Sequence, residues 1–384
     1  MVVCFAFQEV SFRGGAAYFL LIGFLQTCCW HCEEASHPLR QPAAFQERRL
    51  SMQASMENSA LLTEIADKAL LNYDIEVVSK QLIRHNENLL WRVTDHIGNN
   101  FALRIHMPKH GGFIGFQQRK TFIESELMWL QALRTDTDIE VQEPITNKAK
   151  ELVSFITDES IQQSIACTLL TWVDGEVFSQ DDPAAMELTV KMGALQQTLH
   201  AHSQKWVPPA GFRRLIYDET TIVQACDNLG KGIQSGIIGN DDYRIVCDVT
   251  KLICSLFANT PKTKASWGLV HADFLSGNLL IREGQLIPID FSLSGWAYYL
   301  LDPAICLCNL KKHLRKAFIA GYGLQLTEER LYFIEALALY IILVAASRQI
   351  NNIVWKSWFE KRFPVITGEF CQKLQRHVSF IYDI

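Results

Sequence analysis

One stretch of the chain decides the fold: Leu269-Val270-His271-Ala272-Asp273-Phe274-Leu275-Ser276-Gly277-Asn278-Leu279-Leu280-Ile281. A second run follows shortly afterwards, Leu286-Ile287-Pro288-Ile289-Asp290-Phe291. In both runs, apolar residues typical of a buried strand adjoin polar residues typical of a loop. The oxygen-bearing side chains of Asp273, Asn278 and Asp290 are therefore predicted to lie on loops at the ends of strands.

These three side chains suit the chemistry of phosphoryl transfer. Carboxylate and amide oxygens are good ligands for Mg²⁺, a hard cation that also keeps waters and binds substrate phosphates. Phosphoryl transfer needs this neutralisation of charge, together with a carboxylate that orients the attacking hydroxyl. A single loop Asp or Asn commonly does no more than favour a turn. Here four residues separate Asp273 from Asn278, and Asp290 ends an apolar run, so the three together favour a catalytic site.

The pattern resembles the catalytic and metal-binding loops of the aminoglycoside phosphotransferase and choline kinase superfamily. Those loops read His-Gly-Asp-x4-Asn, followed by Asp-Phe or Asp-Trp. Residues 294–303, which read Ser-Gly-Trp-Ala-Tyr-Tyr-Leu-Leu-Asp-Pro, are similar to the segment after the metal-binding Asp in bacterial members. Those members include the stress-response kinases and the homoserine-kinase-like group. The resemblance extends over about residues 60–384.

This resemblance implies an ATP- and Mg²⁺-dependent phosphotransferase that moves the γ-phosphate of ATP to a hydroxyl group. It implies that Asp273 is the catalytic base and that Asn278 and Asp290 are the magnesium ligands. His271 would hold the shape of the loop by packing and hydrogen bonding, without transferring a proton. The acceptor would be a small molecule, such as an amino-alcohol or a sugar, or a Ser or Thr side chain of a protein.

The rest of the chain fits the fold that the resemblance implies, a two-lobed, protein-kinase-like α+β fold. Residues 52–171 are expected to form the ATP-clamping lobe, a small antiparallel sheet crossed by one helix. Its strands are predicted at 75–83, 89–94, 101–105, 151–157 and 164–173, and its helix at 122–134. Residues 172–384 are expected to form a larger catalytic and acceptor-binding lobe, mainly helical, with helices at 184–202, 243–258, 310–321 and 328–348.

A pair that grips phosphate is expected in the N-terminal lobe. Arg104 ends the run Phe-Ala-Leu-Arg at the place where the family has a Lys on its third strand. A guanidinium can hold phosphate oxygens with two hydrogen bonds and stays charged. Its partner is expected on the following helix, with Glu126 preferred and Glu124 as the alternative. Because side chains alternate along a strand, the sequence leaves open whether Arg104 faces the site or the solvent.

Two further segments would complete the nucleotide site. The turn at 84–88, Arg-His-Asn-Glu-Asn, replaces the Gly-rich loop of kinases and contains no glycine. Asn88 is expected to help this turn close over the phosphates, since Asn tolerates left-handed backbone better than most residues. The run at 169–175 fits the hinge between lobes, where backbone groups near Leu170 and Trp172 would bind adenine. A simple strand followed by a turn is the alternative interpretation.

Residues 1–51 share no pattern with the rest of the chain. Their apolar run at 16–25 has the length of a signal-peptide core and is short for a membrane span. Because ATP chemistry belongs inside the cell, we favour a start codon placed too early, with Met52 or Met56 beginning a cytoplasmic protein. A genuine cleaved leader is the alternative.

Composition limits the partners. A net charge of −5 gives no basis for a nucleic-acid partner, which needs a clustered basic face. No apolar run of about 18 residues appears, so stable membrane insertion is not expected. From residue 301 onward eleven Lys and Arg oppose seven Asp and Glu, the wrong sign for a polycationic acceptor if this region lines the pocket. One crowded group, without a second ligand pair at a useful spacing, indicates metal only weakly: Cys28, Cys29, His31 and Cys32.

Two other functions are compatible with parts of this pattern. A nucleotide-binding pseudokinase with a regulatory or scaffold role would have the same fold, but would usually lack one of Asp273, Asn278 and Asp290. A metal-dependent hydrolase using His271 and Asp273 would need more His or carboxylate ligands nearby, and the sequence places none there. The intact trio therefore favours the phosphotransferase.

Overall fold

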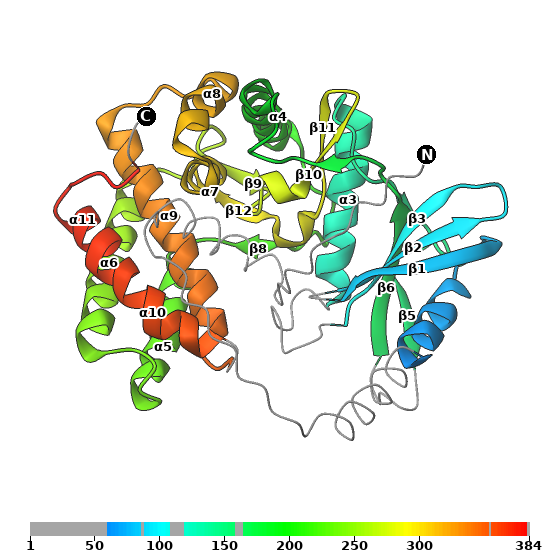
Figure 1. The fold of residues 1–384 in the computed structure, drawn as a ribbon, viewed down its shortest axis with the longest axis horizontal. Helices are drawn as coiled ribbons and strands as arrows, with labels where there is room; N and C mark the ends of the chain where they lie inside the picture. The colour runs from blue at the N-terminus through cyan, green and yellow to red at the C-terminus, as the bar shows by residue number, and fades with distance from the viewer. Residues whose placement is uncertain (1–59, 86–87, 108–118, 158–163, 353–354, 382–384) are drawn as a thin grey trace, which may run out of the picture.

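The computed structural model describes residues 60–85, 88–107, 119–157, 164–352 and 355–381. Figure 1 shows a smaller lobe built on a sheet, beside a larger and mainly helical lobe. The two-lobed α+β fold expected from the sequence is confirmed. Residues 1–51 lie outside the described residues, so the expectation for this segment stays a prediction.

The smaller lobe contains an antiparallel sheet with the strand order β1-β2-β3-β6-β4, and β5 pairs with β6. Every second side chain of β2 is buried, as expected for a strand that covers a core with one face. Asp95 closes the β2–β3 turn, because its carboxylate accepts the N–H groups of Ile97 and Asn99. The strands are β1 (Val77–His85), β2 (Leu89–Asp95), β3 (Asn100–Ile105), β4 (Pro144–Ile145), β5 (Ser154–Thr157) and β6 (Ser164–Thr171).

Two helices flank this sheet. The helix at residues 60–70 packs Leu62, Ile65 and Ala69 into the core behind β2 and β3. On the other side, α3 (Lys120–Asp136) buries a stripe of residues at three- and four-residue spacing: Ile123, Leu127, Leu130 and Leu133. That stripe belongs to the core of the larger lobe. Helix α3 therefore joins the two lobes, and Figure 1 shows it between the sheet and α4.

The larger lobe combines helices with two small sheets, β8-β12-β9 and β11-β10-β7. The strands are β7 (Glu176–Val177), β8 (Leu215–Ile216), β9 (Trp267–Val270), β10 (Leu279–Arg282), β11 (Gln285–Pro288) and β12 (Gly295–Tyr298). The helices are α4 (Ala185–Lys205), α5 (Glu219–Gln234), α6 (Asn240–Asn259), α7 (Leu301–Asn309), α8 (Lys312–Tyr322), α9 (Glu328–Gln349), α10 (Lys356–Val365) and α11 (Gln372–Gln375), with a π-helical segment at Ile366–Cys371.

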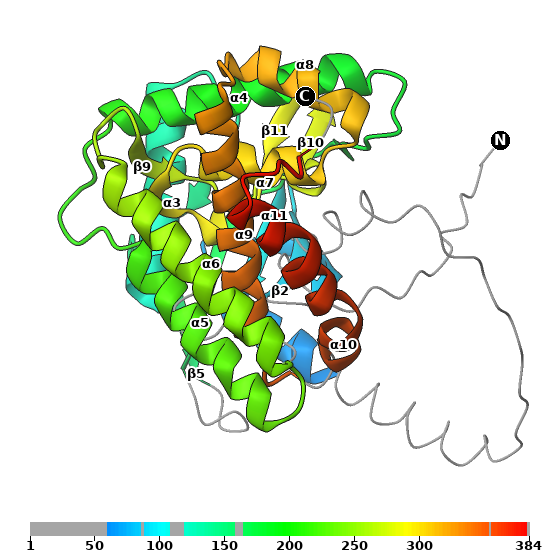
Figure 2. The same ribbon diagram turned by 90° about the vertical axis from the view of Figure 1, so that its left-hand side faces the viewer.

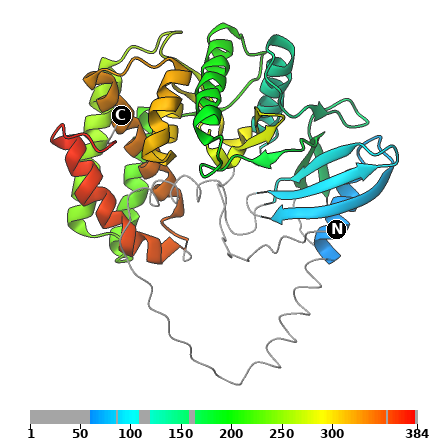
Figure 3. The same ribbon diagram turned by 45° about the horizontal axis from the view of Figure 1, so that its top comes forward.

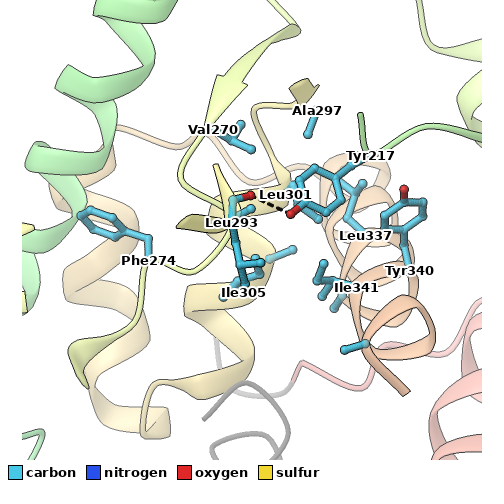
Figure 4. Packing of buried hydrophobic residues seen from close by; sticks show 14 of the residues in the cluster. Tyr217, Val270, Phe274, Leu293, Ala297, Leu301, Ile305, Leu337, Tyr340 and Ile341 are labelled. Carbon is cyan, nitrogen blue, oxygen red and sulfur yellow. Dashed lines mark hydrogen bonds between the residues drawn. The ribbon is translucent and has the colours of Figure 1, made fainter. Parts of the chain in front are cut away.

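Helix α9 forms the centre of the larger lobe. Figure 2 shows it beside α5 and α6, and Figure 4 shows Leu337 and Ile341 of α9 packing toward Leu301 and Ile305 of α7. Its apolar residues occur all around the helix, the pattern of a helix buried on every side. Of the helices in the described part of the chain, α9 is the one whose length and hydropathy would suit a membrane span. However, 78% of its apolar stretch is buried inside the protein, as in a core helix.

The helix expected at 310–321 is α8, and a further helix that was not expected, α7, precedes it. Leu310 and Lys311 adopt extended backbone between the two. The side chain of Gln180 fixes this break by binding the Asn309 carbonyl and the Lys311 N–H. Helix α5 was not expected at all.

Candidate active site

The loop after β9 is fixed by one buried carboxylate, that of Asp302 at the start of α7. Asp302 Oδ2 accepts the N–H of His271 at 2.9 Å, and Oδ1 accepts the N–H of Ala272 at 2.7 Å. Ala272 lies at φ 60°, a left-handed conformation that is costly for a residue with a Cβ. Because Asp302 is fully buried, these bonds hold the loop in this conformation ahead of Asp273.

His200 of α4 contacts the carboxylate of Asp302 in α7. Its Nε2 lies 2.9 Å from Asp302 Oδ2, and its Nδ1 lies 2.8 Å from the hydroxyl of Tyr322 in α8. His200 therefore belongs to a hydrogen-bond network that ends at the loop of Asp273.

The imidazole ring of His271 links the two acidic loops. Its Nε2 lies 3.2 Å from the carbonyl oxygen of Ile289, and its Nδ1 accepts the N–H of Asp273 at 3.3 Å. Burial lowers the pKa of His271, against smaller opposing effects of Asp302 and Asp290, so the ring is neutral at pH 7. A neutral ring that donates from Nε2 satisfies both contacts. These contacts support a structural role, because both ring nitrogens are engaged within the protein.

Asp273 and Asn278 are in direct contact. The amide of Asn278 donates to Asp273 Oδ2 at 2.8 Å and to the Asp273 carbonyl oxygen at 3.0 Å. The short 3₁₀ turn Ser276–Asn278 brings the chain back toward Asp273. The carbonyl oxygen of Asn278 also accepts the N–H of Ile289, the residue before Asp290. The structure therefore joins Asp273, Asn278 and the Asp290 loop in one place.

Asp290 follows β11 in a left-handed conformation, with φ 63°. Its Oδ1 accepts the Ser292 hydroxyl at 2.7 Å, and its Oδ2 lies 3.2 Å from Arg84 Nη2. Burial alone would raise the pKa of Asp290. Arg84, Arg104 and Ser292 together have the larger, opposite effect and lower the pKa to about 2. The carboxylate is therefore ionised at neutral pH.

The residues present fit a hard divalent cation. An ionised carboxylate and a nearby amide oxygen, from Asp290 and Asn278, are suitable ligands when phosphates and waters complete the coordination shell. In the described ranges no three His, Cys, Asp or Glu side chains cluster as a metal site. Waters and phosphate oxygens would supply the remaining ligands of a cation held here.

Arg104 points into the protein and pairs with Glu126 of α3. Its Nη1 lies 2.7 Å from Glu126 Oε1, and its Nη2 lies 3.5 Å from Gln142 Oε1. Burial lowers the pKa of Arg104, but Glu126 and Asp290 raise it by more, so the positive charge is kept. The alternative partner, Glu124, instead pairs with Lys120 at 3.5 Å. The structure therefore places Arg104 on the site side of the sheet.

A second buried arginine, Arg214, was not expected. It lies just before β8, and Glu126 Oε2 is 4.0 Å from its Nη1. Its guanidinium donates at 2.7–2.9 Å to four carbonyl oxygens, those of Phe122, Phe291, Ser292 and Ser294. Arg214 thus ties α3 to the loop that follows Asp290. No motif marks it in the sequence, because its partners meet it only in the folded chain.

The segment after β6 connects the lobes, as the hinge interpretation requires. The N–H of Trp172 donates to the Asn100 carbonyl, and the N–H of Thr171 donates to the Glu143 carbonyl. Adenine would therefore have to use other backbone groups of this segment. Leu170, near the end of β6, is buried. Val173 of the connecting segment packs in a small apolar cluster with Leu280, Ile287 and Ile289.

The structure places Asn88 directly before β2, half-buried. The contact that crosses from the end of β1 to Asp290 is made by Arg84 instead. Arg84 is the first residue of the turn expected to close over the phosphates, and the sequence alone indicates no particular role for it. Its partner is 206 residues away, so local sequence carried no signal for this pair.

Comparison with known proteins places the chain in a family. The model of the phosphotransferase enzyme family (APH) matches residues 81–334. Comparison with curated proteins gives no match.

Solved structures share the fold at low sequence identity. A microcompartment-associated aminopropanol kinase has TM-score 0.65 and 20% identity, covering 83% of this chain and 99% of that one. An amicoumacin kinase in complex with AMP-PNP, Ca²⁺ and Ami has TM-score 0.64 and 18% identity, covering 83% and 94%. A spectinomycin phosphotransferase in complex with ADP and spectinomycin has TM-score 0.55 and 14% identity, covering 82% and 98%.

At these identities the structures show the fold alone, whereas the family match covers most of the chain and all of the carboxylate and amide residues described above. The chain belongs to the phosphotransferase enzyme family.

Proposed function

We propose that this protein is an ATP- and Mg²⁺-dependent kinase that moves the γ-phosphate of ATP to a hydroxyl group of a small molecule. The observation that carries the proposal is the contact between Asp273 and Asn278 at 2.8 Å, next to the ionised Asp290. A carboxylate for the acceptor and oxygen ligands for a cation thus occur together in a member of a phosphotransferase family.

In this proposal Asp273 orients the acceptor hydroxyl and takes its proton as the oxygen bonds to the γ-phosphorus. The bond between the γ-phosphorus and the bridging oxygen breaks, and ADP leaves. Asn278 and Asp290 hold Mg²⁺, which neutralises charge on the phosphates when it is bound. Arg104, fixed by Glu126, holds phosphate oxygens through its charged fork.

Support for nucleotide and divalent metal comes from two structures of this fold, one with AMP-PNP and Ca²⁺ and one with ADP. The proposed adenine site lies at the hinge, next to the apolar cluster of Val173, Leu280 and Ile287. Because cellular ATP is intracellular, we propose a cytoplasmic location.

For the acceptor, the relatives named above act on aminopropanol, amicoumacin and spectinomycin, which supports a small molecule. The excess of four positive charges after residue 301 disfavours a polycation in this chain. We therefore propose a neutral or singly charged hydroxyl compound, such as an amino-alcohol or a sugar.

A screen of hydroxyl acceptors with purified protein, reading ADP release with and without Mg²⁺, tests the proposal. We expect at least one acceptor to raise Mg²⁺-dependent ADP release in the wild type and not in Asp273→Asn. Tight MgATP binding without turnover on any acceptor would instead favour the pseudokinase.

A further inference from the structure

Arg84 is brought to the site by an irregularity in β1. Earlier in the strand, Lys80 faces the rear of the sheet and pairs with Asp67 of the helix at residues 60–70. In an uninterrupted strand, residues four apart face the same side, so Arg84 would also face the rear. A β-bulge between Leu82 and Arg84 reverses the alternation. The bulge therefore turns Arg84 toward the side of the sheet that carries Arg104.

The strand register places the two arginines in one row. Arg84 is paired with Leu90 of β2, and Leu90 is paired with Arg104 of β3. Directly paired residues present their side chains on the same face of a sheet. Arg104 is buried against Glu126, whereas the side chain of Arg84 is 46% exposed and reaches Asp290. Two cations of different exposure, one buried and one partly exposed, thus act on the same carboxylate.

The contact between Arg84 and Asp290 conflicts with cation binding at that carboxylate. Asp290 Oδ1 already accepts the Ser292 hydroxyl, and Oδ2 is the oxygen that faces Arg84 at 3.2 Å. A guanidinium and a divalent cation at one carboxylate oxygen would repel each other. Arg84 is also the last but one residue of β1, at the turn that replaces the Gly-rich loop, and its planar fork suits phosphate oxygens.

We propose that Arg84 is a nucleotide-binding residue that exchanges partners. In the protein without nucleotide it neutralises Asp290, and it moves to the phosphates of a nucleoside triphosphate when a divalent cation takes its place at the carboxylate. This inference rests on the proposed function. The exchange makes the cation and the nucleotide bind cooperatively. The cation releases Arg84 from Asp290, and the phosphates then neutralise the charge of the released arginine.

Binding measurements on Arg84→Met test the exchange without relying on turnover. Met keeps the length of the side chain and removes its charge. Binding of Mn²⁺, a paramagnetic substitute for Mg²⁺, is followed by electron paramagnetic resonance, and ATP binding is measured by calorimetry in EDTA and with saturating Mg²⁺. We expect Arg84→Met to bind Mn²⁺ alone severalfold more tightly. We expect it to bind ATP roughly fivefold to tenfold more weakly. This loss of affinity is smaller than for a buried arginine, because solvent screens the charge of the partly exposed Arg84.

Lys80→Met is the matched control, because it removes a cation from the same strand on the opposite face of the sheet. It should leave Mn²⁺ and ATP binding unchanged, and Arg84→Lys should recover part of the ATP affinity. Unchanged affinities in Arg84→Met would overturn the proposal, and so would tighter Mn²⁺ binding with wild-type ATP affinity. If the wild type itself bound neither ATP nor MgATP, the proposed function and the role of Arg84 would both be wrong. This outcome differs from one in which the wild type binds ATP and only the role of Arg84 is wrong.

Discussion

Arg104 and Glu126 form an ion pair whose side chains are only 10% and 5% exposed. Removing one partner of such a pair leaves an uncompensated buried charge, which costs more than the pair contributes. The same logic applies to Asp302, whose carboxylate is fully buried and satisfied by two amides and His200. At the scale of the residue, the site consists of charges whose positions are set by buried partners.

We predict that Arg104→Ala raises the KM for ATP and also lowers kcat, because the charge contacts phosphate before and during transfer. Loss of a desolvated, charge-assisted contact should cost roughly 1.5–3 kcal/mol in kcat/KM. Arg104→Lys should recover part of it, since the charge returns without the planar fork. Steady-state kinetics at saturating Mg²⁺ measures both, and wild-type kinetics for Arg104→Ala would remove this residue from the site.

We predict that Asp290→Ala weakens MgATP binding more than Asp273→Ala does. Asp290 is assigned to the cation that binds with the nucleotide, whereas Asp273 is assigned to the acceptor hydroxyl. Titration of MgATP against the two variants compares them directly. Equal affinities would contradict this division of roles.

The prediction that Asp273, Asn278 and Asp290 lie together could be made from local spacing, because all three lie within one short segment beside apolar strands. Local spacing could not select Arg84 or Arg214. Their partners lie 206 residues and about 80 residues away, and neither arginine is part of a recognisable pattern. Contacts of that range are fixed by how the lobes pack, which one sequence does not reveal.

At the scale of the element, α4 and α8 touch backbone to backbone. A Cβ on Gly321 would lie 2.0 Å from the carbonyl oxygen of Val190, and one on Gly193 would lie 2.3 Å from that of Phe318. This close crossing brings His200 of α4 to Tyr322 of α8, and so fixes the support for Asp302.

We predict that Gly321→Ala lowers the free energy of unfolding by about 1–3 kcal/mol, since backbone atoms must separate to admit the methyl group. Gly368→Ala is the matched control, because a Cβ built there would point into open space. It should be neutral or slightly stabilising, as replacing a helical Gly usually is. Thermal and denaturant unfolding compare the two variants, and equal stabilities would contradict the close packing.

Helix α5 shows why one element could not be predicted. Its buried stripe of Ile222, Ala225, Cys226 and Leu229 has helical spacing, and Asp218 caps its N-terminus. Gly230 and Gly232 lower helix propensity and obscure that pattern. In the folded protein both face close neighbours, because a Cβ would lie 2.8 Å from the Tyr243 hydroxyl and 2.7 Å from Ile350 Cδ1 respectively. Tertiary packing overrides propensity here.

At the scale of the whole molecule, α3 connects the sheet of the smaller lobe to the larger lobe. Its Ser125 accepts the Arg213 N–H at 2.8 Å, and Trp129 Nε1 donates to His202 Nδ1 at 3.3 Å. Figure 3 shows α3 next to α4, between the sheet and the helices of the larger lobe. The sequence predicted the two lobes but not this connection, because the stripe of α3 does not reveal which core it joins.

We predict that residues 1–51 are dispensable for folding and activity. Their composition differs from that of the following chain, and they contain none of the residues assigned to the site. A protein beginning at Met52 should be soluble, with the unfolding temperature and kinetics of the full chain. A protein that fails to fold would show that the leader is structural.

The central claim is that Asp273 promotes transfer of phosphate to a hydroxyl. The most direct measurement follows radiolabelled γ-phosphate from ATP onto an acceptor, in wild type and in Asp273→Asn. We predict a labelled phosphomonoester whose formation requires Mg²⁺ and falls ~100-fold or more in the variant, while ATP binding is kept. Transfer by Asp273→Asn above a tenth of the wild-type rate, or a wild type that labels no acceptor, would contradict the account.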